Sequence, residues 1–271
     1  WSGAPRDTVD FFRRVKEQTY HLRDGGVAVG PADRDVARIR IEYDTAGHQA
    51  RVRIATGMPG VVVRQSVNGK APTPTSPIVI DSAPVVGSGL HRLQPFLDGA
   101  PILGERQITV VRNRALGKPV RETPAARGQY QGTGVGTLTD GLAGSIDHAD
   151  GLWHGWLGRD VEAIVDLQSI QPVDTVTATF LGNIRSWIMM PPEVDFALSD
   201  DGATWTTLAD VKSAIPSDKE GAIIQPFTAT AKAGTRARYV RVTGRYAGPL
   251  PAWHPGAGRP SWLFADEIVI R

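Results

Sequence analysis

Aromatic side chains gather in a loop-forming stretch near the end of the chain, where they could hold a sugar. Trp253 and His254 lie within residues 248–261, whose prolines remove ladder donors and whose glycines add backbone freedom. An aromatic ring stacks on the apolar face of a pyranose, while arginine or histidine hydrogen-bonds its hydroxyl groups. The candidate carbohydrate contacts are Trp253, His254, Trp187, Trp262 and Arg245.

Packing is the competing explanation for these aromatic residues. Trp262 stands at the start of a predicted strand, where a core position is the simpler expectation. Two roles remain open for Trp187. It could belong to the core, or it could anchor its loop against another domain. Trp253 and His254 are therefore the strongest ligand contacts, although their loop could instead face an active site or another domain.

Acidic residues are the next candidates for chemistry, but none forms a convincing catalytic pair. Asp266 and Glu267 are neighbours on a predicted strand, so their side chains should point to opposite faces. Asp200 and Asp201 precede Gly202 in a turn pattern. The sequence also lacks the zinc-protease, serine-hydrolase and phosphate-loop motifs. We therefore expect no catalytic residue and no organic cofactor in this chain.

Composition narrows the classes of partner. The 271 residues carry 30 Lys and Arg against 28 Asp and Glu, and this balance argues against a nucleic-acid partner. With no cysteine, the chain has neither a disulfide framework nor a thiolate metal site. No apolar run approaches the roughly 20 residues of a membrane helix, so no membrane span is expected.

The elements that must position these residues are mostly strands. Residues 7–24 show the apolar spacing of an amphipathic helix that begins after Pro5 and stops at Gly25 and Gly26. From Val36 onward the apolar residues alternate with polar ones, which is the period of a half-buried strand. Predicted strands are 36–43, 49–55, 61–67, 77–80, 107–112, 161–167, 174–181, 193–199, 204–208, 237–243 and 262–270.

The fold class is therefore mainly β, with two modules after the helix. Residues 34–115 are expected to form a small β-sandwich. Residues 116–136, rich in Gly, Pro, Arg and Thr, are expected to be a linker or an ordered lead-in. Residues 137–271 combine long loops with many strands and almost no helix, which indicates a jelly-roll sandwich.

Several motifs of this second module resemble a known family when taken in order. They are Leu138-Thr139-Asp140-Gly141, Trp153-His154-Gly155-Trp156, Ile164-Val165-Asp166-Leu167, Ser199-Asp200-Asp201-Gly202, Arg238-Tyr239-Val240-Arg241-Val242 and Asp266-Glu267-Ile268. This combination resembles the discoidin, or coagulation factor 5/8 type C, domain, the jelly roll that family 32 carbohydrate-binding modules also use. The resemblance covers about half of the chain.

A narrower resemblance is to the C-terminal end of bacterial β-N-acetylhexosaminidases of glycoside hydrolase family 20. Residues 250–258 and 262–268 look like the end of those enzymes, and residues 68–77 look like a turn of their small chitobiase-type C-terminal sandwich. Residues 1–33 then resemble the tail of the catalytic (β/α)₈ barrel, with Trp1 at a tryptophan that lines the sugar pocket. The catalytic Asp and Glu of that barrel have no counterpart in this sequence.

The resemblance implies a function by association. The chain would be a non-catalytic accessory region that binds glycans with N-acetylhexosamine or galactose, positions a barrel of the same protein, or does both. Its parent would be a secreted, periplasmic or cell-surface glycoside hydrolase. Two alternatives remain open, namely a purely structural scaffold for the barrel and a free discoidin-type adhesion module.

The same resemblance implies a structural Ca²⁺ site, because discoidin-like modules often hold this ion where an early loop meets the last strand. Calcium prefers carboxylate and carbonyl oxygens. The implied ligands are Asp140 and Glu267, with Asp147 in place of the usual threonine or serine. The alternative is that Asp140 only makes a turn with Gly141 and that Glu267 is solvated.

Overall fold

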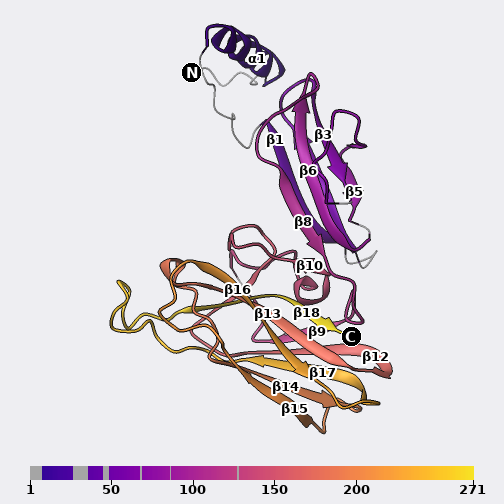
Figure 1. The fold of residues 1–271 in the computed structure, drawn as a ribbon, viewed down its shortest axis with the longest axis vertical. Coiled ribbons are helices and arrows are strands. Elements are labelled where there is room, and N and C mark those ends of the chain that lie inside the picture. Colours follow the sequence, from indigo (N-terminus) through magenta and orange to yellow (C-terminus); the bar gives the residue numbers. More distant parts are fainter. Residues whose placement is uncertain (1–7, 27–35, 45–48, 68, 86, 127) are drawn as a thin grey trace. The chain divides into compact units, whose positions relative to one another are not determined.

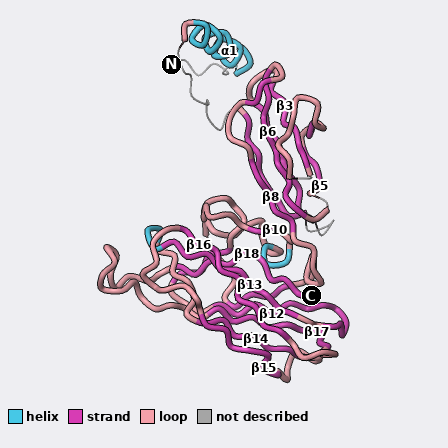
Figure 2. The backbone as a smooth tube through the Cα atoms, in the orientation of Figure 1, coloured by secondary structure: helices cyan, strands magenta, loops and turns pink. Residues whose placement is uncertain are grey.

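The computed structural model describes residues 8–26, 36–44, 49–67, 69–85, 87–126 and 128–271 (Figure 1). The chain divides into two compact units. The first comprises Trp1–Glu42 and Arg51–Ile108, and the second comprises Tyr43–Ala50 and Thr109–Arg271. Strands dominate both units, as the tube drawing shows (Figure 2).

Helix α1, Thr8–Asp24, belongs to the first unit and lies where the sequence predicts a helix over residues 7–24. Arg14 forms an ion pair with Asp10, one turn earlier, at 3.0 Å. An ion pair at this spacing stabilises the helix on its exposed face. Phe11 and Leu22 are exposed on this helix. Among the described residues, no helix is both long enough and apolar enough to cross a membrane.

The strands of the first unit form two sheets. One has the order β1-β2-β5, and the other runs β8-β6-β3-β4 with β7 paired to β6. The bounds are β1 Ala37–Asp44, β2 Gln49–Thr56, β3 Val61–Ser66, β4 Ile78–Val79, β5 Ser82–Pro84, β6 Gly89–Leu97, β7 Ala100–Pro101 and β8 Arg106–Val110.

His91 of β6 leads to a prediction about pH. Its ring is buried, Nδ1 lies 3.3 Å from Gln65 Nε2, and Nε2 has no hydrogen-bond partner. Burial lowers the pKa of His91 below 6.5. The unfolded chain therefore binds this proton more readily, so the first unit should gain stability as the pH rises to about 6.5.

Urea unfolding at several pH values between 5 and 7.5 measures this gain. His91→Leu removes the titrating ring, so the contribution of His91 to the pH dependence should disappear. An unchanged slope in the variant would assign the pH dependence to other groups.

The second unit is a β-sandwich of one four-stranded and one five-stranded sheet. Their strand orders are β11-β18-β13-β16 and β15-β14-β17-β12-β9. The bounds are β9 Val120–Thr123, β10 Leu142–Ala143, β11 His154–Leu157, β12 Val161–Pro172, β13 Thr175–Asn183, β14 Glu193–Ser199, β15 Thr206–Lys212, β16 Ala222–Thr230, β17 Arg236–Gly244 and β18 Trp262–Ile270, with short 3₁₀ turns η1 Thr137–Thr139 and η2 Ile184–Ser186. Strand β10 pairs with Thr109 and Val110.

Alternation along the strands explains the core of this sandwich. In β12 the residues Val161, Ala163, Val165 and Leu167 are buried, while the intervening residues are partly exposed. Phe180 of β13 meets Phe227 of β16 edge-to-face, with ring centroids 5.5 Å apart. The apolar faces of both sheets therefore supply one packed core.

The structure adds strands that the sequence did not predict. Strands β6 and β16 each contain a proline, Pro95 and Pro226, and proline argues against a central strand. Strand β16 lies at a sheet edge, where the missing donor is tolerated. In the stretch 116–136, β9 pairs with β12 and forms the edge of the five-stranded sheet.

Candidate functional site

The loop between β17 and β18 presents the most exposed tryptophan of the second unit. Its backbone is closed by hydrogen bonds from Leu250 N to Arg259 O at 2.8 Å and from Gly258 N to Leu250 O at 2.9 Å. Trp253 lies at the surface of this loop with 50% of its area exposed. A backbone fixed before binding lowers the entropy cost of presenting the indole to a ligand.

His254, the neighbour of that tryptophan, has a structural role. It is buried, its Nε2 lies 2.7 Å from Ile184 O, and its Nδ1 accepts a hydrogen bond from Gly256 N at 2.9 Å. Since Nδ1 accepts, Nε2 is the protonated nitrogen that donates to the carbonyl. Nε2 thus fastens the loop to η2, and Nδ1 closes a turn within the loop. Both ring nitrogens of His254 are therefore engaged, and neither is free to bind a sugar hydroxyl.

Trp187 packs beneath this loop. Its ring meets His254 edge-to-face at 6.3 Å, and the Arg259 guanidinium lies 5.5 Å from its centroid. A Cβ at Gly256 would lie 3.0 Å from the Trp187 ring, which shows how closely the loop packs on this side chain. Trp187, His254 and Trp253 therefore form one assembly, and Arg259 is a member that the sequence analysis did not identify.

The other two predicted contacts lie elsewhere. Trp262 is half-buried and packs with Tyr130 and Phe264, which fits the core alternative. Arg245 pairs with Asp160 at 3.1 Å and with Asp195 on the outer face of the five-stranded sheet. The hydrogen bonds that Arg245 donates to Asp195 and Asp160 raise the pKa of its guanidinium. Its guanidinium is therefore already paired with two carboxylates.

Asp140 and Glu267 are both buried, and the fold brings these distant positions together. Glu267 bonds to Gly141, which directly follows Asp140 and lies 126 positions before Glu267. Glu267 Oε2 accepts from Gly141 N at 2.9 Å, and its Oε1 accepts from Asn113 Nδ2 at 3.1 Å. Asp140 Oδ1 accepts from Leu142 N at 2.8 Å, and its Oδ2 accepts from Thr133 Oγ1. The alternative of a solvated Glu267 is therefore wrong, because 2% of this residue is exposed.

Asp266 adds a third buried carboxyl group. It accepts from Gly144 N at 2.7 Å, and burial raises its pKa to about 7. Burial also raises the pKa of Asp140 and Glu267 well above the ordinary range, and the mutual repulsion of these charges adds to the effect. Within the described part of the chain, no lysine or arginine forms a salt bridge with any of the three.

The carboxylate oxygens of Asp140 and Glu267 are the kind of ligand that a hard cation prefers. Each carboxylate oxygen accepts one protein hydrogen bond and keeps a second lone pair, and a dication would offset the charge that burial disfavours. Asp147 differs from this pair, because it is exposed and its Oδ1 caps Ala149 N at 3.0 Å. The structure thus brings together two of the three predicted ligands.

A separate acidic group lies on the outer face of the five-stranded sheet. Glu193, Asp195 and Asp210 have carboxylate oxygens within 4.8 Å of one another. They line a polar groove of about 540 Å³ together with Arg241 and Arg245. Because Arg245 already pairs with Asp195, we interpret this group as a network of surface ion pairs and not as a metal site.

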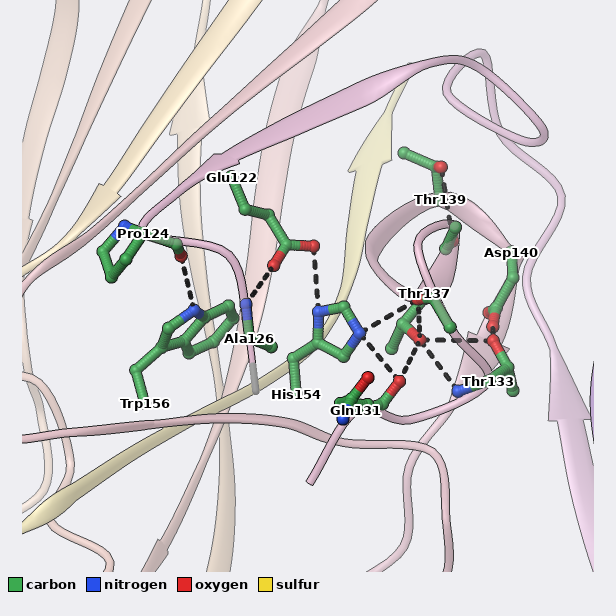
Figure 3. Close-up of polar contacts among 12 residues, drawn as sticks. Glu122, Pro124, Ala126, Gln131, Thr133, Thr137, Thr139, Asp140, His154 and Trp156 are labelled. Carbon is green, nitrogen blue, oxygen red and sulfur yellow. Dashed lines mark hydrogen bonds and ion pairs between the residues drawn. The ribbon is translucent and has the colours of Figure 1, made fainter. Parts of the chain in front are cut away.

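A buried network around His154 was also missed by the sequence analysis (Figure 3). His154 Nδ1 lies 2.9 Å from Glu122 Oε1, and its Nε2 lies 3.0 Å from the carbonyl oxygens of Gln131 and Gly134. The available signal was the Trp-His-Gly-Trp motif at residues 153–156, which gives no indication of the partner at position 122.

One family model and several solved structures match part of this chain. The F5/8 type C domain family matches residues 126–263, all of which belong to the second unit. Solved structures similar to this chain include three carbohydrate-binding domains. Chitosan-binding module 1 of a chitosanase/glucanase from Paenibacillus sp. IK-5 is 20% identical, with a TM-score of 0.36, over 59% of this chain and 98% of that one.

The second is the family 32 carbohydrate-binding module of NanJ from C. perfringens, in complex with galactose. It is 14% identical with a TM-score of 0.37, over 60% of this chain and 98% of that one. The third, the lectin domain of lectinolysin in complex with the Lewis B antigen, is 18% identical with a TM-score of 0.36, over 60% and 98% of the two chains. No curated protein sequence matches the chain. Trp1, the predicted pocket aromatic, lies outside the described residues.

Proposed function

Because this chain belongs to the F5/8 type C domain family, we propose that it is a non-catalytic accessory region that binds carbohydrate. The observation that carries the proposal is the half-exposed Trp253 on a loop with a hydrogen-bonded backbone. An indole held in this way offers a flat apolar face to the C–H groups of a sugar ring. The ligand class is a glycan with terminal N-acetylhexosamine or galactose.

The proposed parent protein is a bacterial β-N-acetylhexosaminidase of glycoside hydrolase family 20 that acts outside the cytoplasm. Support comes from the resemblance of residues 68–77, 250–258 and 262–268 to the C-terminal part of such enzymes. In this assignment a catalytic barrel of the same protein cleaves the sugar, and this chain binds or positions the substrate. Residues 1–33 would then be the tail of that barrel.

Calorimetric titration of the folded chain with N-acetylglucosamine, chitooligosaccharides and galactose-terminated glycans tests the binding function. Trp253→Ala should weaken the interaction by about tenfold or more, since loss of an aromatic contact of about 1.4 kcal/mol has this effect. Trp253→Phe, which keeps an aromatic face, should retain part of the affinity. Ile170→Ala removes another exposed apolar side chain of the same unit and should leave binding unchanged.

A second candidate function is a scaffold that buttresses the catalytic barrel. The exposure of Phe11 and Leu22 on α1 favours it, because an amphipathic helix normally buries its apolar side chains. Absence of heat with every glycan, from a chain shown to be folded, would contradict the carbohydrate function and favour the scaffold.

The proposed cofactor is a structural Ca²⁺ held by the carboxylates of Asp140 and Glu267. A bound calcium would neutralise their buried charge and link the loop before β10 to the last strand, β18. This proposal concerns stability, and it is independent of which glycan the Trp253 loop recognises.

A further inference from the structure

A polar hollow lies at one end of the second unit, between the β14–β15 turn and the β16–β17 turn. Its volume is about 730 Å³, and its lining comes from within residues 198–208 and 230–236. Strands β15 and β16 are edge strands of the two sheets, so the hollow lies where the sandwich is open. Small-molecule sites in proteins have volumes of roughly 300–1,000 Å³, and this hollow falls within that range.

The hollow is separate from the Trp253 loop. Arg236, which lines the hollow, is the first residue of β17, and the Trp253 loop follows Gly244, the last residue of that strand. The nine residues of β17 span roughly 25 Å, at about 3.3 Å per residue. The two sites therefore lie at opposite ends of one strand, and each can be tested without the other.

Apolar side chains form one part of the lining. Leu198 of β14 is 9% exposed and belongs to the core of the sandwich, and Leu208 of β15 is half-buried against the same core. Because both side chains pack on the core, this surface is already formed before a ligand binds. It can receive the C–H groups of a small ligand.

The polar side chains with unused hydrogen-bonding capacity are mostly donors. Lys232 and Arg236 line the hollow, and neither forms a salt bridge with a carboxylate of the described residues. Arg236 Nη2 donates to Ile170 O at 3.0 Å, which holds the guanidinium and leaves its other N–H groups available. Thr206 and Thr230 add two hydroxyl groups to the lining. The hollow therefore suits a ligand that is rich in acceptors.

The two acidic side chains of the lining differ in their partners. Asp201 Oδ1 accepts from Ala203 N and Thr204 N, both at 2.8 Å. It also accepts from Ser199 Oγ at 2.9 Å, so this carboxylate closes the β14–β15 turn. Asp200 is exposed, and its carboxylate can only accept hydrogen bonds at neutral pH. A ligand must therefore offer hydroxyl donors as well as an anionic group.

We propose that this hollow binds a sugar acid, which is a pyranose that carries a carboxylate, such as a hexuronate. Its carboxylate accepts charge-assisted hydrogen bonds from Lys232 and Arg236, which are stronger than hydrogen bonds between neutral groups. Its ring hydroxyls donate to Asp200, and its C–H groups lie on Leu198 and Leu208. A neutral sugar would leave the two cations without a partner, and a simple anion would leave the apolar surface unused.

This site goes beyond the proposed function, whose ligand is an N-acetylhexosamine or galactose glycan at the Trp253 loop. An NMR titration of the ¹⁵N-labelled chain with D-glucuronate tests it. The amide signals of Thr206, Lys232 and Arg236 should shift and saturate, whereas the indole N–H signal of Trp253 should stay in place. Glucose has the same ring without the carboxylate, and acetate has the carboxylate without the ring. Each should bind at these amides about tenfold more weakly or worse, because each lacks one set of contacts.

The chain offers a matched pair of lysine variants. Lys232→Gln should weaken glucuronate binding by about threefold to tenfold, since one ion pair at a partly exposed site is lost. Lys212 is exposed at the opposite end of β15, so Lys212→Gln should leave the affinity unchanged. Trp253→Ala should also leave it unchanged, which separates this site from the Trp253 loop.

Each outcome decides the proposal. Saturable shifts at the hollow that weaken in Lys232→Gln alone would support it. A folded chain whose amides at the hollow do not respond to glucuronate would overturn it, whether or not the Trp253 loop binds a glycan. Equal affinity for glucose would show that the charge is not recognised, and equal affinity for acetate would show a general anion patch. Either result, or loss of glucuronate binding in Trp253→Ala, would also contradict a sugar-acid site in the hollow.

Discussion

Calcium at a hundredfold excess over its dissociation constant is expected to stabilise the second unit by about 2.7 kcal/mol. For a unit of this size, that corresponds to a rise of roughly 5–10 °C in melting temperature. The physical reason is that Asp140 and Glu267 are buried carboxyl groups without a cationic partner among the described residues. Differential scanning calorimetry with Ca²⁺ or with a chelator at pH 8 measures the change.

The size of this change should depend on pH. Burial raises the pKa of Asp140 and Glu267, and it raises that of Asp266 to about 7, so the folded chain holds protons that the unfolded chain releases. Without calcium, the stability of the unit should therefore fall as the pH rises from the unfolded values of about 4 through the raised folded values. The calcium effect should be larger at pH 8 than at pH 5, because protons compete for the same oxygens.

Two variants locate the site. Asp140→Asn combined with Glu267→Gln should abolish the rise in melting temperature that calcium causes. The difference between the melting temperatures with and without calcium is the measure, because the substitutions also alter hydrogen bonds and so change the absolute melting temperature. Asp147→Asn should leave the shift unchanged, since Asp147 is exposed and caps its own loop. An undiminished shift in the double variant would place the ion elsewhere.

Gly144→Ala is expected to lower the free energy of unfolding of the second unit by about 1–3 kcal/mol, which is the usual cost of overpacking a core. A Cβ at this position would come within 2.3 Å of the Trp153 ring. The ring cannot easily retreat, because it is buried and its Nε1 donates to Ser145 O at 3.0 Å. The backbone N–H of Gly144 also donates to Asp266, so a shift of the backbone would disturb a buried carboxylate. Urea unfolding monitored by tryptophan fluorescence measures the loss.

Gly182→Ala is the matched control for this prediction. A Cβ there would meet the Met190 Cε at 3.2 Å, and this flexible end of a side chain can move by a few tenths of an ångström. The control should therefore cost clearly less than Gly144→Ala. Equal losses in the two variants would show that Trp153 yields as easily as Met190.

Many strands were predictable because apolar and polar residues alternate along them, and this signal lies within a few neighbouring residues. The predicted strands at 49–55, 193–199 and 262–270 closely match β2, β14 and β18. Strand β16 was missed because Pro226 weakens its pattern, and only the sheet order shows that it lies at a tolerant edge. The short strands β9 and β11 are stabilised by partners from distant parts of the sequence, which no local pattern reveals.

The candidate site residues were likewise predictable only in part. The composition of residues 248–261 was sufficient to predict an irregular loop around Trp253, because prolines and glycines exclude regular structure locally. The sequence could not separate Trp253 from His254, since only the folded loop shows that His254 reaches Ile184 O and has no free nitrogen. Arg245 had the right chemistry for a sugar contact, but cross-strand neighbours in the fold pair it with Asp160 and Asp195.

The sequence by itself determined the β class, the family resemblance and the identity of two acidic residues that the fold brings together. Tertiary structure alone decided that Asp140 and Glu267 are buried, that Asp147 is not, and that Glu122 meets His154. The physical reason is that periodicity and turn chemistry act over a few residues, whereas burial and the contacts between side chains depend on which distant strands pair.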